Sequence, residues 1–267
     1  MLYAIAFLPL QNEFKYRGVL MKIKEFGNES KPVIILIHGG GLGYWSWNKV
    51  IEEIKNDFCI KTVIIDGHGE DFESDFISIE ETASKIESYF KSIGISKVHG
   101  ICGLSIGAQI TVELLSRNAE LAENWLIESA LVIKMEKITK LVLPLITLMY
   151  PLVKMRWYAK LQSQTLQIED SLFEKYYEDS SKMSLNTLRA VTESNSNYEL
   201  KKPTIISKSN VQIFVGSREP KIMLKSAKLL SESIEGSKLQ ILQGFKHGEF
   251  SLKHTKKYVE TIKSFKA

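Results

Sequence analysis

The sequence predicts an α/β protein: a mostly parallel, doubly wound sheet with a helical cap inserted after the sixth strand. Short β-branched runs alternate with amphipathic helical segments along most of the chain, which is typical of parallel strands joined by crossover helices. Residues 131–200 interrupt that alternation with a helical stretch rich in Leu, Met, Tyr and Trp. Gly103-Leu-Ser-Ile-Gly107 marks a tight turn between a strand and a helix.

The composition is that of an ordinary globular protein. The chain has 267 residues, of which 44% are hydrophobic and 25% charged, and this length suffices for one large core. The net charge of +4 is small and the lysines are scattered, so no nucleic-acid partner is expected. Cys59 and Cys102 lie in apolar runs without metal-ligand spacing. They indicate buried, reduced thiols, and hence a cytoplasmic protein with no metal or cofactor.

Two apolar segments are long enough to be compared with a signal peptide or a membrane-spanning helix. Residues 1–10 lack the basic start and the small-residue cleavage site of a signal peptide. They are predicted to be a first strand, and a poor signal sequence is the alternative. Residues 141–153 contain two prolines and are shorter than the roughly 20 residues of a membrane span. No stable membrane insertion is therefore expected, whereas a homodimer stays open.

The first elements follow from short patterns. Residues 14–26 alternate in places and break at Gly18, which favours strands of an antiparallel edge. Residues 33–37, Val-Ile-Ile-Leu-Ile, are an uninterrupted apolar run, typical of a strand buried on both faces of a parallel sheet. An amphipathic helix is expected at 46–56 and a second buried strand at 58–65.

The next helix carries its own boundary signals. Ser78 stands in the N-cap position and Glu81 three residues later, as in a capping box, and Gly94 follows the last turn. These signals predict a helix over 78–93. A strand over 96–102 then leads into the glycine-rich turn.

The remaining alternation places the insertion. A helix is expected at 108–116 and a strand at 124–130, which ends the first part of the core (1–130). The helical cap spans 131–200, and the second part of the core spans 201–267. Its expected elements are a strand at 211–215, a helix at 221–234, a strand at 238–242 and a helix at 254–265.

The turn around Ser105 has the spacing of a nucleophile elbow, in which a strand, a tight turn with Ser at its apex and a helix follow one another. The flanking Gly103 and Gly107 let the strand and the helix pass without Cβ clashes. The turn lifts the hydroxyl out of the sheet, and the N-terminus of the helix can stabilise a developing oxyanion.

Three further motifs, together with this elbow, resemble those of the α/β-hydrolases. His38-Gly-Gly40 is similar to the family's oxyanion turn, and Asp66-Gly-His-Gly69 is similar to its Asp-x-x-Gly-His-Gly loop in a shortened form. Gly244-Phe-Lys-His247 is similar to its catalytic-histidine loop after the last strand. The resemblance covers about the whole chain except the cap, and the order Ser, acid, His is also the family's order.

The resemblance implies a catalytic triad. Ser105 would be the nucleophile, and His247 would be the general base and then the general acid. Glu219 stands where the family usually has Asp, and it would orient the histidine. Glu128, at the end of a strand, is the rival acid, and Asp66 is a third choice.

The resemblance also implies an oxyanion hole made by the backbone N–H groups of Ile106 and Gly40. Aromatic residues after the oxyanion turn are expected to face the acyl pocket, and packing under the cap is the alternative role. The predicted substrate contacts are accordingly Tyr44, Trp45 and Leu104.

These residues predict a serine hydrolase that cleaves a small or medium apolar carboxylic ester through an acyl-enzyme. The apolar cap favours such a substrate, since it can line a cleft above the site. Thioesterase, lactonase, amidase or C–C hydrolase activity is the alternative with the same triad. A non-catalytic ligand-binding protein on this fold is the alternative from another class.

Overall fold

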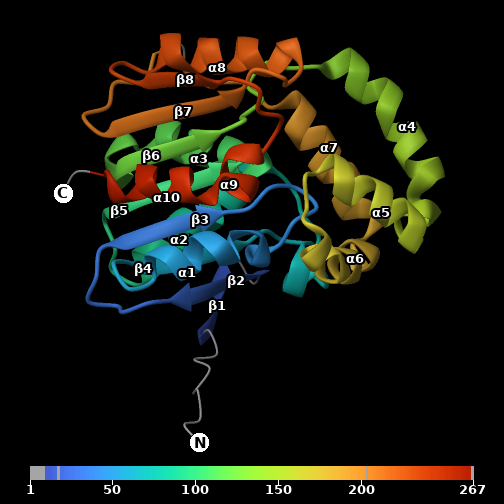
Figure 1. Cartoon of the computed structure of the whole chain (residues 1–267), viewed down its shortest axis with the longest axis horizontal. Coiled ribbons are helices and arrows are strands. Elements are labelled where there is room, and N and C mark those ends of the chain that lie inside the picture. Colours follow the sequence, from blue (N-terminus) through green and yellow to red (C-terminus); the bar gives the residue numbers. More distant parts are fainter. Residues whose placement is uncertain (1–9, 17–18, 203, 266–267) are drawn as a thin grey trace, which may run out of the picture.

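One sheet runs through the part of the chain that the structure describes, residues 10–16, 19–202 and 204–265 of a computed structural model. In these residues eight strands pair in the order β1-β2-β4-β3-β5-β6-β7-β8 (Figure 1). β1 and β2 are antiparallel to their neighbours, and the other pairs are parallel. The strands are β1 (Leu10–Tyr16), β2 (Val19–Phe26), β3 (Val33–Ile37), β4 (Cys59–Ile64), β5 (Val98–Leu104), β6 (Ala122–Glu128), β7 (Asn210–Gly216) and β8 (Lys238–Leu242).

The predicted antiparallel edge and the mostly parallel sheet are confirmed. The strand expected at residues 1–10 lies outside the described residues except for Leu10, where β1 begins. Successive side chains of the central strands alternate between two hydrophobic layers, as in Ile34 and Ile35 of β3. Both layers are apolar because helices cover both faces of the sheet.

The helices divide between those two layers, as Figure 1 shows. One layer holds α1 (Asn48–Ile54), α9 (Glu249–Lys253) and α10 (Thr255–Lys263). The other holds α2 (Ile79–Ser92), α3 (Ile106–Arg117) and α8 (Lys221–Ser233). Helix α2 begins after its predicted cap, where the Ser78 hydroxyl accepts a hydrogen bond from the Glu81 N–H.

Two predicted helices differ at their ends. The segment expected as one helix over 46–56 opens with a 3₁₀ turn, Tyr44–Trp47, before α1. The helix expected over 254–265 is preceded by the separate short helix α9, which ends at Lys253, and α10 begins at Thr255. In the described part of the chain, no helix is both long enough and apolar enough to cross a bilayer.

The chain reverses its direction of progress across the sheet between β3 and β5. From β3 it passes through α1 to β4 on one side, and from β4 it returns through α2 to β5 on the other. Loops that follow β3 and β5 diverge at this switch point and leave a crevice at the carboxyl ends of the strands. The turns that follow these two strands, which begin at His38 and Ser105, therefore border a common site.

Four α-helices stand between β6 and β7 in the sequence. They gather beyond the carboxyl ends of the strands (Figure 1), and we call them the cap. They are α4 (Glu136–Val153), α5 (Arg156–Thr165), α6 (Phe173–Lys182) and α7 (Leu185–Asn197).

Hydrogen bonds fix two of these helices to the core. Asp179 of α6 accepts from the indole N–H of the buried Trp45 at 2.6 Å. Helix α7 is held at three points along its length. These contacts are Phe76 N–H to the Thr187 hydroxyl, Ile79 N–H to the Ser194 hydroxyl, and the Gln109 amide to the Asn195 carbonyl.

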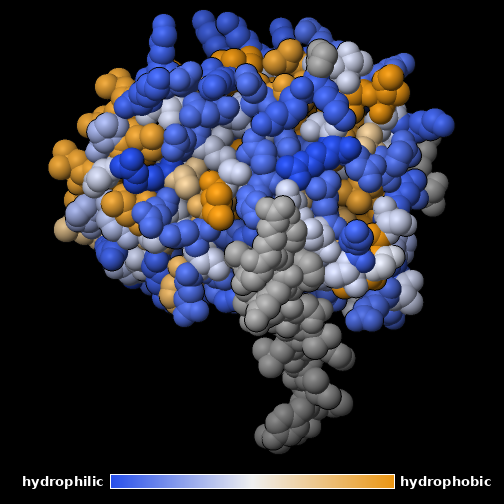
Figure 2. Space-filling model, turned by 180° about the vertical axis from the view of Figure 1, so that it is seen from behind, coloured by the Kyte–Doolittle hydropathy of each residue, from blue (hydrophilic) through white to orange (hydrophobic). Residues whose placement is uncertain are grey.

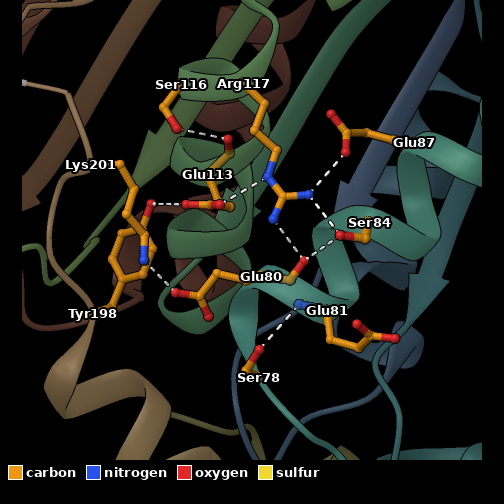
Figure 3. Close-up of polar contacts among 10 residues, drawn as sticks. All are labelled: Ser78, Glu80, Glu81, Ser84, Glu87, Glu113, Ser116, Arg117, Tyr198 and Lys201. Atoms are coloured by element: carbon orange, nitrogen blue, oxygen red, sulfur yellow. Dashed lines mark hydrogen bonds and ion pairs between the residues drawn. The ribbon is translucent and has the colours of Figure 1, made fainter.

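A charged network at the end of α3 joins this helix to α2 and to the segment that leaves the cap (Figure 3). Arg117 donates to the carboxylates of Glu113 and Glu87 and to the backbone carbonyl of Glu80. The Tyr198 hydroxyl donates to the other oxygen of Glu113 at 3.0 Å. The network thus fixes where the chain re-enters the core after α7.

A buried ion pair joins α2 to the loop after β4. Lys85 is completely buried, and its ammonium contacts the carboxylate of Asp66, which is also buried. Burial raises the pKa of Asp66 despite the nearby Lys85. Each charge is tolerated in this place because the other one is present.

We expect Lys85→Met to lower the free energy of unfolding by about 3–5 kcal/mol, because it leaves the Asp66 carboxylate buried without its cation. The double variant Lys85→Met/Asp66→Asn should recover most of that loss. Urea denaturation of both variants and the wild type measures the effect. A double variant as unstable as the single one would mean that side-chain packing, and not charge, makes Lys85 necessary.

Candidate active site

Ser105 occupies a strained turn between β5 and α3. It has φ 57° and ψ −117°, a backbone conformation that residues other than glycine rarely adopt. A Cβ at Gly103 would lie 2.3 Å from the Gly107 carbonyl oxygen, and a Cβ at Gly107 would lie 2.3 Å from the Ile37 carbonyl oxygen. Only glycine fits either position, so the Gly-x-Ser-x-Gly pattern follows from close packing of strand and helix.

The structure brings Ser105, His247 and Glu219 into one hydrogen-bonded chain. His247 Nε2 lies 3.0 Å from Ser105 Oγ, and His247 Nδ1 lies 2.7 Å from Glu219 Oε2. Ser105 follows β5, Glu219 follows β7 and His247 follows β8. The imidazole is 39% exposed whereas the Glu219 side chain is fully buried, so the histidine can meet a ligand while its acid is shielded from solvent.

Three hydrogen-bond donors keep the Glu219 carboxylate ionised. Burial alone would raise the pKa of this carboxyl, but hydrogen bonds hold it below its ordinary value. They come from His247 at Oε2, and from the Gly216 N–H and the Ser129 hydroxyl at Oε1, the last two at 2.7 Å. Glu219 is therefore an anion at neutral pH, with its second oxygen aimed at the imidazole.

Ser129 is a residue that the sequence analysis missed. It follows β6 and has φ 60°, a strained conformation for a serine. Its N–H donates to the Phe214 carbonyl while its hydroxyl reaches Glu219. A single serine after a strand gives no signal in a sequence, and the positive φ is visible only in the structure.

The two other candidate acids lie elsewhere. Glu128 is buried at the end of β6, and its carboxylate accepts from the N–H groups of Phe250 and Ser251, at the start of α9. Asp66 contacts Lys85. Of the three carboxylates, Glu219 is the one hydrogen-bonded to His247.

The turn after β3 is fixed by a neutral histidine. Burial lowers the pKa of His38 to about 3. Its Nε2 accepts from the Ile65 N–H at 3.1 Å, so the ring proton is on Nδ1, which donates to the Gly39 carbonyl at 2.9 Å. Because the peptide is planar and trans, this bond directs the Gly40 N–H away from His38.

A cavity of about 310 Å³ lies between this turn, Ser105 and the cap. Gly40 and Ile106, the two predicted oxyanion donors, are both in its wall. Helices α4 to α7 supply most of the rest, and the lining is largely apolar. The lining residues are Gly40, Gly41, Ser105, Ile106, Val153, Gln162, Leu166, Tyr176, Ser180, Met183, Leu188, Val191, Thr192 and Asn195.

Tyr44, Trp45 and Leu104, the three predicted substrate contacts, are not among the residues that line this cavity. The Tyr44 ring lies under the ammonium of Lys24, a residue of β2. Trp45 is buried and bonded to α6, and Leu104 is buried in the layer that contains α1 and α10. The cap helices take the place that these side chains were expected to fill.

A second, larger hollow of about 630 Å³ lies on the surface between α1 and α10 and includes Lys49 and Lys257, but Ser105 is not part of its lining. Within the described ranges, no group of three or more His, Cys, Asp or Glu side chains is placed to hold a metal ion.

Comparisons with known proteins support the architecture. No family model and no curated protein sequence matches the chain. Among solved structures, a hydrolase from Pseudomonas aeruginosa PA01 has a TM-score of 0.80 at 13% identity, over 96% of this chain and 97% of that one. An α/β hydrolase family protein from Desulfitobacterium hafniense has a TM-score of 0.70 at 20% identity, over 90% and 98%. The carboxylesterase CesB from Bacillus subtilis has a TM-score of 0.70 at 17% identity, over 97% and 92%.

The buried Glu128 makes stability depend on pH. Burial raises the pKa of Glu128 to about 7, against about 4.3 in an unfolded chain. Folding therefore favours its protonated form, and this contribution to stability is complete below about pH 4 and is lost as the pH rises to 7.

The amide side chain of Glu128→Gln does not titrate, so we expect this variant to gain stability relative to the wild type between pH 4.5 and 8, by at most about 4 kcal/mol. Urea denaturation at several pH values measures the difference. A difference that stays constant over this pH range would contradict a raised pKa of Glu128.

Proposed function

We propose that this chain, which has the α/β-hydrolase fold, is a serine hydrolase that cleaves a small or medium apolar carboxylic ester through an acyl-enzyme. One observation carries the proposal. Ser105, His247 and Glu219 form a continuous hydrogen-bonded chain, and its serine end lies in the wall of an apolar cavity. An activated serine beside such a cavity has what acyl transfer requires.

The acylation step follows from the tautomer of His247. The Glu219 anion accepts from Nδ1–H, so the lone pair of Nε2 faces Ser105 Oγ. As Oγ attacks the ester carbonyl carbon, Nε2 takes its proton. The resulting imidazolium is stabilised by Glu219, which stays ionised. Nε2 then gives this proton to the departing alcohol oxygen, and Ser105 carries the acyl group.

The oxyanion of this step would be held by two backbone N–H groups. Ile106 is the first residue of α3, where helix N–H groups have no partner within the helix. Gly40 lies across the cavity wall, and the bond from His38 to the Gly39 carbonyl fixes the peptide to which its N–H belongs. Donors oriented before the reaction cost no reorganisation as charge develops.

Deacylation repeats the same chemistry with water. The partly exposed His247 can bind a water molecule where the alcohol has left, and Nε2 removes its proton as the water oxygen attacks the acyl carbon. The proton returns to Ser105 Oγ as the acid departs.

The cavity sets the expected substrate. Its volume of about 310 Å³ is near the lower end of the usual range for ligand sites, which favours a short or medium acyl group. None of the described residues that line it carries a charge, so nothing there would hold a charged head group. The same triad would serve a thioester, lactone or amide, and no contact in the cavity favours one of them. The contact between Glu219 and His247 argues against the ligand-binding alternative.

Labelling with a fluorophosphonate probe tests the nucleophile. We expect the wild type to be labelled at Ser105 and to hydrolyse p-nitrophenyl esters, with short or medium acyl chains preferred. Ser105→Ala should abolish both activities. Ser180→Ala is the matched control for the position of the label and should still be labelled at Ser105, because Ser180 also lines the cavity but donates to the Tyr177 carbonyl and not to a histidine. If the wild type neither reacts with the probe nor turns over any ester, the proposal fails.

Glu219→Gln tests the acid. The amide would present the wrong hydrogen-bonding group or tautomer to His247, so we expect kcat to fall roughly 10²- to 10⁴-fold with KM little changed. The exposed Glu235 provides the control Glu235→Gln, which should keep wild-type rates. Retention of full activity in Glu219→Gln would return the role of acid to Glu128.

A further inference from the structure

Helix α4 exposes a stripe of large apolar side chains. The stripe consists of Ile138, Leu141, Leu145, Leu148 and Met149. Leu141 is 71% exposed and Leu148 is 77% exposed, values normal for a lysine and not for a leucine in a folded domain. Figure 2 shows hydrophobic side chains along the edge of the molecule where α4 lies, on the left of that view.

The stripe is the outer face of a helix whose inner face is already occupied. Its members stand three, four, three and one residues apart, the spacing of one helical face. On the other side Thr139 and Val153 are buried, Thr147 accepts a hydrogen bond from Arg189 of α7, and Val153 lines the cavity. Packing of α4 on the cap therefore does not explain the outer leucines.

The apolar surface continues into α5 across the turn between the two helices. Met155 and Leu161 are exposed large hydrophobic residues, and the Trp157 side chain is 62% exposed. An exposed tryptophan beside an aliphatic stripe is typical of protein surfaces that lie at a membrane–water interface. We call the two helices together the α4–α5 surface.

Positive charge accompanies this surface. Residues 134–160 contain six basic side chains and one acidic one, a net charge of +5 in a chain whose total is +4. The acidic partners outside this segment are Asp170 and Glu174, which pair with Lys160 and Arg156. Counting these two, the surface still has three more cations than anions. The basic residues of the segment are Lys134, Lys137, Lys140, Lys154, Arg156 and Lys160.

We propose that the α4–α5 surface binds the face of an anionic lipid bilayer, with α4 lying in the plane of the interface. The leucines and Trp157 enter the boundary between head groups and acyl chains, while the lysine and arginine heads contact lipid phosphates. The charges favour this partner over a second copy of the chain, because a symmetric pair of these surfaces would bring two basic rims together. The proposal does not depend on the proposed ester hydrolysis.

Co-sedimentation with vesicles tests the binding. The probes are vesicles of phosphatidylcholine alone and of phosphatidylcholine with about 30% phosphatidylglycerol, whose negative surface attracts basic segments. The full chain should sediment with the anionic vesicles and at least roughly tenfold less with neutral ones. Leu141→Gln/Leu148→Gln should weaken that binding at least roughly tenfold, since two large apolar side chains no longer enter the interface.

The controls distinguish binding through the α4–α5 surface from nonspecific adsorption to vesicles. Glutamine is a good helix former, so the double variant should keep the wild-type circular dichroism and melting temperature. Ile206 is 75% exposed outside the cap, and Ile206→Gln should bind as the wild type does. Lys137→Glu/Lys154→Glu should lose binding to anionic vesicles, whereas Lys225→Glu/Lys228→Glu on α8 should keep it.

Three outcomes would overturn the proposal. The wild type could fail to sediment with anionic vesicles, or the double leucine variant could bind as tightly as the wild type. Alternatively, light scattering could show a dimer that the leucine substitutions dissociate, and a second copy of the chain would then be the partner of the stripe. None of these measurements uses ester turnover, so they are independent of whether the chain is an esterase.

Discussion

The close approach of α3 to the carboxyl end of β3 is the constraint on which the rest of the site depends. Gly107 lies so near the Ile37 and His38 carbonyls that no side chain fits between them. This contact fixes the helix that follows Ser105 relative to the turn that contains Gly40. The nucleophile, the helix N-terminus and the oxyanion turn are thereby held in one geometry, with Ser105 in a strained conformation that the packing around it enforces.

The remaining groups reach this fixed point from other strand ends, and hydrogen bonds hold each of them in place. Glu219 is oriented by the Gly216 N–H and by Ser129, so the acid that faces His247 is itself supported by β6 and β7. Glu128 binds the start of α9, just after the loop of His247. Two buried carboxylates thus act on one loop from two sides, one through the imidazole and one through the backbone.

Much of the fold could be predicted because its signals are local. Buried parallel strands such as 33–37 and the glycines around Ser105 leave direct marks on the sequence. The choice between Glu219 and Glu128 could not be made in the same way, since both lie at or just beyond the ends of strands that share one edge of the sheet. Tyr44 and Trp45 were expected near the pocket but are not among the residues that line the cavity. Trp45 instead packs against α6, a contact between distant parts of the chain that their proximity to the oxyanion turn in the sequence does not reveal. The wall made by α4 to α7 depends on contacts between distant residues, for which a single sequence carries no signal.

The attachment of α6 and α7 to the core determines when this part of the chain becomes ordered. The bonds from Trp45, Phe76, Ile79 and Gln109 place both helices against the sheet before any ligand arrives. The conformational entropy of this wall is therefore lost when the chain folds and not when a ligand enters. Opening of the cavity as a rigid swing of the whole cap would break all four bonds at once. An opening that keeps these bonds must therefore come from movement of α4 and α5.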